Sequence, residues 1–97
     1  MKIRDIVGFD WDTANREKNW LKHKVAWAES EQAFFNEPLL IDPDINHSSQ
    51  EKRFHALGRT NDGRLLFISF TIRANSIRII SARPMSRLER KTYEENF

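Results

Sequence analysis

The chain has 97 residues, which is enough for one domain and too few for a two-domain enzyme or a fold built around a large cofactor. Its apolar content of 39 % suffices for a hydrophobic core, and the absence of cysteine excludes disulfides, thiolate zinc sites and cysteine nucleophiles. The net charge of +2 is uneven, since residues 1–51 carry six Lys and Arg against ten Asp and Glu, whereas residues 52–97 carry ten against four.

Such a basic half is typical of a protein that binds an anionic polymer such as nucleic acid, or an acidic protein partner. A solvated basic surface is the ordinary alternative. Eight of the ten cations in this half are arginine, whose planar fork suits phosphate and carboxylate.

The first part of the chain predicts two helices. Asp12 is suited to cap a helix over 13–22, because its carboxylate can accept a backbone N–H at the positive helix end. A second helix is expected over 27–35, with Trp27 and Phe34 on one side. Its cap position holds Ala26, which cannot accept a backbone N–H, so the start of this helix should be weaker.

After Pro38, short stretches rich in β-branched and aromatic residues predict strands. A possible edge strand spans 39–42. The Asp-Pro-Asp sequence at 42–44 predicts a turn that leads into a polar loop containing His47.

The next stretch predicts an antiparallel sheet. Strands over 52–59 and 64–71 flank the Asn-Asp-Gly sequence at 61–63, which is the clearest hairpin signal in the chain. A turn at Ala74 and Asn75 leads into a further strand over 76–82.

Pro84 suits the first turn of a last helix, whose core-facing residues are expected to be Met85, Leu88 and Thr92 or Tyr93. The order of two helices, three or four antiparallel strands and one helix predicts a two-layer α+β sandwich. Because no linker, repeat or low-complexity segment interrupts the chain, residues 1–97 are expected to form a single domain.

Alternation along the strand over 52–59 divides its side chains between two faces. One face carries Arg53, His55, Leu57 and Arg59, and the other carries Phe54, Ala56 and Gly58. If the helices cover the second face, the first face stays exposed, with Glu51 just before it. It then offers what metal-free RNA cleavage needs: a base for the 2′-OH proton, an acid for the leaving 5′-oxygen, and fixed cations. The alternative is a plain solvent face on which Glu51 and Arg53 form an ion pair worth about 0–1 kcal/mol.

Other residues and motifs give weaker indications of catalysis or of ligand binding. Lys22 and His23 end the first helix, where cations complement the helix dipole, so a capping role is their default interpretation. His47 has no companion at metal-ligand spacing, and the three scattered histidines predict no metal site. The chain contains no GxGxxG, Walker or G-x-S-x-G motif, so no nucleotide cofactor is expected.

Nothing in the sequence predicts contact with a membrane. No purely apolar run is longer than the four residues of 65–68, and the start of the chain lacks the apolar core of a signal peptide. Together with the absence of cysteine, these features favour a cytoplasmic protein.

Several stretches, taken with their order and spacing along the chain, resemble the BrnT toxin family. They are FDWD at 9–12, LKHKV at 21–25, WAESEQAFF at 27–35, HSSQEKRFHALGRT at 47–60, GRLLFISFTIR at 63–73 and RIISARPMSRLERKTYE at 78–94. The most specific parts are Glu51, Arg53 and Gly58 followed by Gly63 and Arg64, then RIISAR, then Glu89, Arg90 and Tyr93. The likeness spans almost the whole chain after Phe9.

This resemblance implies a RelE-like fold and a metal-independent endoribonuclease that cleaves mRNA as the toxin of a type II toxin–antitoxin system. It also implies a BrnA-type antitoxin, a ribbon-helix-helix protein whose dimer joins two toxins in a 2:2 heterotetramer and represses the shared operon. The toxin would contact operator DNA only through that antitoxin.

The polar residues that the resemblance implies for catalysis are Lys22, His23, Glu51, Arg53, Arg73 and Arg83. The three arginines would bind the scissile phosphate, and Glu51 or His23 would act as base or acid. Further RNA-binding candidates are His55, Arg59 and Arg78.

Two positions depart from the family pattern. Lys24 stands where glycine usually forms a left-handed helix end, at a cost of about 1 kcal/mol if that geometry is kept. Ala26 replaces a polar cap, a loss of about 1 kcal/mol.

A non-catalytic module that binds antitoxin or nucleic acid through the basic sheet face is the alternative function.

Overall fold

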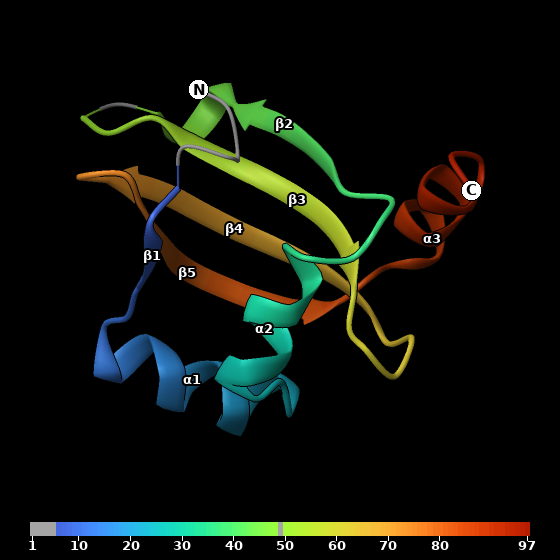
Figure 1. Ribbon diagram of the computed structural model, residues 1–97, viewed down its shortest axis with the longest axis horizontal. Coiled ribbons are helices and arrows are strands. Elements are labelled where there is room, and N and C mark those ends of the chain that lie inside the picture. The colour runs from blue at the N-terminus through green and yellow to red at the C-terminus, as the bar shows by residue number, and fades with distance from the viewer. Residues whose placement is uncertain (1–5, 49) are drawn as a thin grey trace.

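A computed structural model describes residues 6–48 and 50–97, and its central feature is a single mixed sheet (Figure 1). The five strands lie in the order β1-β5-β4-β3-β2. They are β1 (Gly8–Asp10), β2 (Leu40–Asp44), β3 (Arg53–Arg59), β4 (Leu65–Arg73) and β5 (Ser76–Pro84). Strands β2 to β5 pair antiparallel, whereas β1 pairs parallel to β5. The α+β class is confirmed, and the sheet gains a parallel edge strand that the sequence did not predict.

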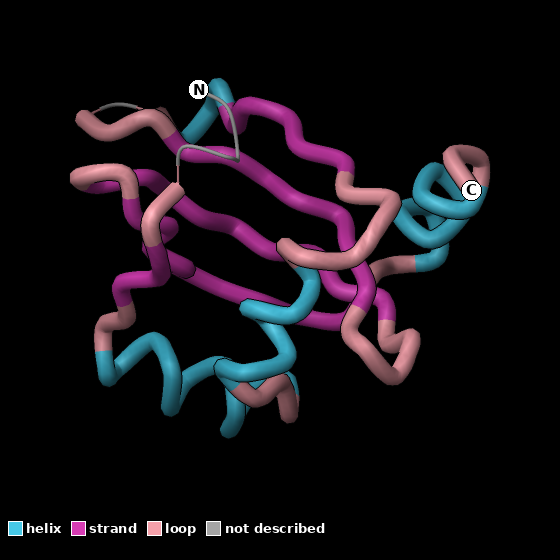
Figure 2. The backbone as a smooth tube through the Cα atoms, in the orientation of Figure 1, coloured by secondary structure: helices cyan, strands magenta, loops and turns pink. Residues whose placement is uncertain are grey.

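Two helices cover one face of this sheet, α1 (Thr13–His23) and α2 (Trp27–Ala33) (Figures 1 and 2). The predicted cap of α1 is confirmed, since Asp12 Oδ1 accepts the Ala14 N–H at 2.8 Å. The helix ends in left-handed geometry at Lys24, with φ 55° and ψ 39°. The left-handed geometry in which glycine is usual is therefore adopted by a lysine, at a cost of about 1 kcal/mol.

The second helix is shorter than predicted. It ends at Ala33, and Ala26 makes no side-chain cap; only Glu29 Oε1 accepts the Ala26 N–H, at 3.1 Å. Phe34 is buried in the core, but Trp27 is 44 % exposed, so the expected apolar side shared by these two residues is not formed. Instead, the Arg16 guanidinium lies 4.7 Å above the Trp27 ring.

The hydrophobic core lies between these helices and the sheet. Its largest members from β4 are Leu66, Ile68 and Phe70, each at most 1 % exposed. The Phe70 ring lies 5.1 Å from that of Phe34 in perpendicular geometry. A Cβ atom added to Gly58 would lie 2.9 Å from the Ala33 carbonyl oxygen, so glycine at this position lets α2 approach β3 closely.

The predicted hairpin turns are confirmed. Thr60 and Gly63 close the β3–β4 connection, with the Gly63 N–H bonded to the Thr60 oxygen at 2.9 Å. Ala74 and Asn75 connect β4 to β5 with positive φ angles of 48° and 63°. The predicted turn at 42–44, however, is wrong, because these residues lie in β2. Pro43 lacks an N–H, and the outer position of β2 tolerates that loss.

The last helix, α3 (Arg87–Glu94), begins later than predicted. Ser86 and Glu89 form a reciprocal capping box that starts the helix, whereas Pro84 ends β5. Met85 and Tyr93 are buried as expected, and Leu88 is 72 % exposed, contrary to expectation. Tyr93 Oη donates to the Pro38 carbonyl oxygen at 2.6 Å and so ties α3 to the segment before β2.

Residues 1–5, in which no signal-peptide core was expected, lie outside the described residues. Among the described helices, none combines the length and the apolarity that a membrane crossing requires.

Candidate functional site

The sheet face opposite α1 and α2 carries the polar side chains of three strands. On β3 the predicted alternation is confirmed, because Ala56 and Gly58 are buried while Arg53, His55 and Arg59 are not. The register aligns Arg53 with Thr71 and Arg78, His55 with Ser69 and Ser81, and Leu57 with Phe67 and Arg83. We call this surface the open face.

At one end of the open face, Glu51 and Arg73 form a two-point ion pair. Arg73 Nε donates to Glu51 Oε2 at 2.6 Å, and Arg73 Nη2 donates to Oε1 at 2.5 Å. These hydrogen bonds from Arg73 hold the pKa of Glu51 below its usual range and raise the pKa of Arg73. The partner of Glu51 is therefore Arg73, and the Glu51–Arg53 pair considered as an alternative does not form.

Arg78 lies in the same region and forms ion pairs with two carboxylates. Its Nη1 donates to Asp10 Oδ2 at 3.1 Å and its Nη2 to Asp12 Oδ2 at 3.5 Å. Because Asp12 also caps α1, Arg78 joins the start of that helix and strand β1 to β5.

At the other end of the open face, Arg83 pairs with Glu89. The Nη1 and Nη2 atoms of Arg83 donate to the two carboxylate oxygens at 2.8 and 2.9 Å. The guanidinium also lies 4.2 Å above the centre of the Phe67 ring. His23 is close to this pair: burial first, then the charges of Lys22 and Arg83, lower its pKa. This lowered pKa favours the neutral form of the His23 imidazole.

The ionisation of Glu89 makes the stability that the Arg83–Glu89 pair contributes depend on pH. Its pKa is lowered mainly by the Arg83 hydrogen bonds, so its contribution to stability is complete above its ordinary value of 4.5 and is lost as the pH falls through the folded-state pKa. We expect Glu89→Gln to be less stable than wild type at neutral pH and to lose less stability on acidification below 4.5. Urea unfolding across this range measures both effects. Glu94→Gln, at an exposed position of the same helix, is the matched control and should follow wild type.

The structure does not join the catalytic candidates into one contact set. Lys22, His23 and Arg83 lie in one group, and Glu51, Arg53 and Arg73 in the other. Among the described residues, no carboxylate lies within ion-pair distance of the Arg53 guanidinium, whereas Arg73, Arg78 and Arg83 are each paired. Arg59 lies apart, 5.7 Å above the Phe97 ring.

A cluster of one carboxylate and two imidazoles that the sequence did not predict lies on β2, β3 and the turn after β2, with Asp44 opposite Arg53 in the strand register. Asp44 Oδ2 is 2.8 Å from His47 Nδ1 and 2.9 Å from His55 Nε2. The Asp44–His47 spacing of i, i+3 was visible in the sequence, but the contact with His55 depends on the pairing of β2 with β3. Within residues 6–48 and 50–97, no group of three or more His, Cys, Asp or Glu side chains is arranged to hold a metal ion.

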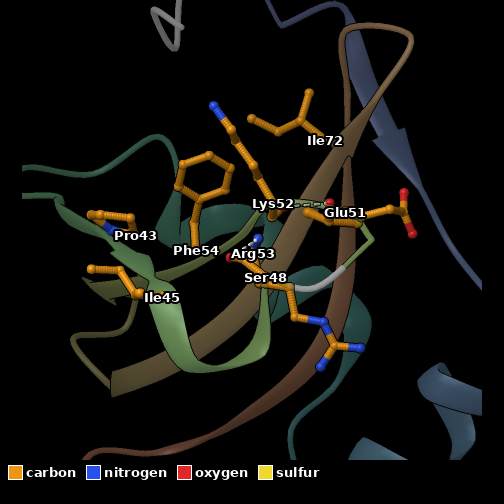
Figure 3. A pocket seen from close by; sticks show the side chains of 9 residues that line it. Pro43, Ile45, Ser48, Glu51, Lys52, Arg53, Phe54 and Ile72 are labelled. Carbon is orange, nitrogen blue, oxygen red and sulfur yellow. Dashed lines mark hydrogen bonds between the residues drawn. The ribbon is translucent and has the colours of Figure 1, made fainter.

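A hollow of about 780 Å³ lies beside Arg53. Figure 3 shows Lys52, Phe54 and Ile72 extending to one side of the sheet and the Arg53 guanidinium to the other. Phe54 and Ile72, which pack against the core, line this hollow together with Glu51, Arg53 and Thr71.

Comparisons with known proteins give one family. The family model described as "Ribonuclease toxin, BrnT, of type II toxin-antitoxin system" matches residues 11–89. Among solved structures, the 1.1 Å crystal structure of the Brucella abortus ribonuclease toxin BrnT matches with a TM-score of 0.63 and 22 % sequence identity. The match covers 82 % of this chain and 97 % of that one, and at this identity it shows the fold. A comparison with curated proteins finds no match.

Proposed function

The chain belongs to the BrnT family of ribonuclease toxins of type II toxin–antitoxin systems, and on this premise we propose that it cleaves mRNA without a metal ion on its open face. The observation that carries this proposal is Arg53, a cation on that face with no carboxylate within ion-pair distance among the described residues. A phosphodiester that crosses the open face could form the direct ion pair that Arg53 does not form with a described carboxylate.

The proposed reaction is attack of the ribose 2′-oxygen on its own phosphate. It needs a base for the 2′-OH proton, an acid for the departing 5′-oxygen, and cations that stabilise the charge of the pentavalent phosphorus. His23 supports the role of base because its lowered pKa favours the neutral imidazole, which can accept a proton. Glu51 is the second candidate, although its two bonds to Arg73 compete with that role.

Arg53 would be the main phosphate ligand, with Arg73 and Arg83 in support. A guanidinium has five N–H groups, so the two bonds from Arg73 to Glu51 leave further donors for an RNA oxygen. Their carboxylate partners also hold Arg73 and Arg83 in fixed positions, which reduces the entropy lost when RNA binds. Lys22, His55, Arg59 and Arg78 would add attraction for the RNA backbone.

The test is cleavage of purified RNA in excess EDTA. The proposal expects cutting to persist and the products to carry 2′,3′-cyclic phosphate or 3′-phosphate together with 5′-hydroxyl ends. Loss of activity in EDTA with recovery on adding a divalent cation would contradict metal independence. Products with 5′-phosphate ends would contradict the 2′-oxygen as nucleophile.

The ion pairs on the open face favour a second candidate, a non-catalytic module in which paired arginines dock an antitoxin or nucleic acid. Folded protein that leaves RNA intact and that, expressed without a partner, does not slow bacterial growth would support this candidate. Growth arrest together with RNA cutting would exclude it.

The proposed partner is a ribbon-helix-helix antitoxin of the BrnA type, in a 2:2 heterotetramer that reaches operator DNA through the antitoxin. The chain would act in the cytoplasm as one toxin domain spanning residues 1–97. Light scattering on the purified, co-expressed complex measures the stoichiometry directly.

A further inference from the structure

The cluster around Asp44 places two imidazoles on one carboxylate oxygen. The side chain of Asp44 is only 7 % exposed, that of His47 is 65 % exposed, and that of His55 is 35 % exposed. Burial alone would raise the pKa of Asp44, but the hydrogen bond from His47 and the charges of both histidines outweigh it and lower the pKa. The carboxylate is therefore ionised and acts as a fixed negative partner for both rings.

The two histidines differ in what else holds them. His47 belongs to the short turn Ile45–His47 that follows β2, and the Ser48 hydroxyl also ties this turn to the Asp44 carbonyl oxygen at 2.6 Å. His55 comes from β3, and the regular β2–β3 pairing already fixes its backbone. Its bond to Asp44 is thus not needed to hold either the turn or the strand.

That bond does orient the His55 ring on the open face. Because Nε2 faces Asp44, the second ring nitrogen, Nδ1, is left to exchange a proton with a bound molecule. The ring centre lies 4.7 Å from that of Phe67, and Arg83 lies over Phe67. Arg53 is on the same face of β3, two residues or roughly 7 Å along the strand. An exchangeable proton is therefore placed between two arginines.

We propose that His55, held in place by Asp44, donates the proton that the leaving 5′-oxygen takes up during RNA cleavage. This inference rests on the proposed ribonuclease function and assigns its missing acid. As the 2′-oxygen forms its bond to phosphorus, the bond from phosphorus to the 5′-oxygen breaks, and the proton on His55 Nδ1 passes to that oxygen. The products are a 2′,3′-cyclic phosphate and a 5′-hydroxyl, and the imidazole is left neutral. Asp44 is a positioning residue, which sets the orientation of the ring through its 2.9 Å contact with Nε2.

Two substrates test this assignment. One is an ordinary short RNA, and the other has sulfur in place of the bridging 5′-oxygen at the cleavage site, since a thiolate leaves without needing a proton. We expect His55→Gln to cleave the ordinary RNA about 10² to 10⁴ times more slowly than wild type. The same variant should cleave the sulfur substrate at close to the wild-type rate. Asp44→Asn should show the same pattern with a smaller loss.

His47→Gln is the matched control. It removes the other imidazole from the same carboxylate oxygen, outside the proposed machinery, and should cleave both substrates as wild type does. His55→Asn provides a second replacement of different size, and melting temperatures confirm that each variant compared is folded.

The outcomes separate this inference from the function on which it rests. If wild type cleaves RNA and the folded His55 variants cleave it equally well, or lose the same factor on both substrates, His55 is not the acid, and the ribonuclease proposal stands. If wild type cleaves neither substrate, both proposals are overturned.

Discussion

Arg53→Ala is expected to lower the rate of RNA cleavage by about 10² to 10³, the typical effect of removing one preorganised group that stabilises transition-state charge. The physical reason is that Arg53 combines a position on the open face with the absence of a carboxylate within ion-pair distance in the described part of the chain. Arg53→Lys should recover only part of the rate, because an ammonium lacks the planar fork that binds two phosphate oxygens. Single-turnover cleavage of a labelled RNA measures the effect.

Arg87→Ala is the matched control for this prediction. Arg87 is an exposed arginine at the start of α3, so its removal changes the net charge by the same amount without touching the open face of β3. Its effect should be confined to a small loss of general attraction for RNA. Equal losses in the Arg53 and Arg87 variants would show that net charge, and not a phosphate site at Arg53, supports cleavage.

Phe70→Ala is expected to reduce the free energy of unfolding by about 3–5 kcal/mol, a large fraction of the stability of a small domain. The side chain is 1 % exposed, and its ring contacts Phe34 from α2 and stacks on Phe54 of β3 at 5.5 Å. Its removal leaves a cavity where helix and sheet meet. The melting temperature should fall by more than about 10 °C, as measured by thermal denaturation.

Leu88→Ala tests whether burial accounts for this loss. Leu88 is 72 % exposed on α3, so the same kind of truncation should change the unfolding free energy by less than about 0.5 kcal/mol. A large loss from Leu88→Ala would mean that Leu88 is covered in solution, by a partner or by another copy of the chain.

Local signals predicted much of the fold. Asp12 caps α1, the Asn-Asp-Gly sequence lies in the β3–β4 connection, and Ala74 and Asn75 turn the chain into β5, because each of these features depends on a few neighbouring residues. Strand β1 was missed for the opposite reason. It has only three residues, and its partner strand begins at Ser76, far along the chain.

Contacts beyond the single residue also explain the errors near prolines. Asp42 and Pro43 have the composition of a turn, but pairing with β3 keeps them extended at the sheet edge. Pro84 suits a helix start, but the side chains of Ser86 and Glu89 satisfy each other's backbone N–H groups two residues later. A tertiary or reciprocal contact overrode the single-residue preference in both places.

Of the candidate site, the sequence predicted only which side chains share a face of the sheet. Alternation along β3 was enough to place Arg53 and His55 together, since it depends on the strand alone. The ionic partners were not predictable, because Glu51 and Arg73 meet only once β3 and β4 have formed a hairpin. The Asp44–His55 contact likewise requires the β2–β3 register, which places the two residues near each other diagonally across the strands.

Pro43 affects how readily the protein associates with itself when no partner chain is bound. An outer strand with unsatisfied N–H groups is a template onto which another chain can add and begin to aggregate. At one border of the sheet Pro43 removes such a donor, and at the other β1 is short and Asn19 Oδ1 accepts the Ala82 N–H of β5 at 3.3 Å. Both borders therefore discourage the self-association to which small sheet proteins are prone at high concentration.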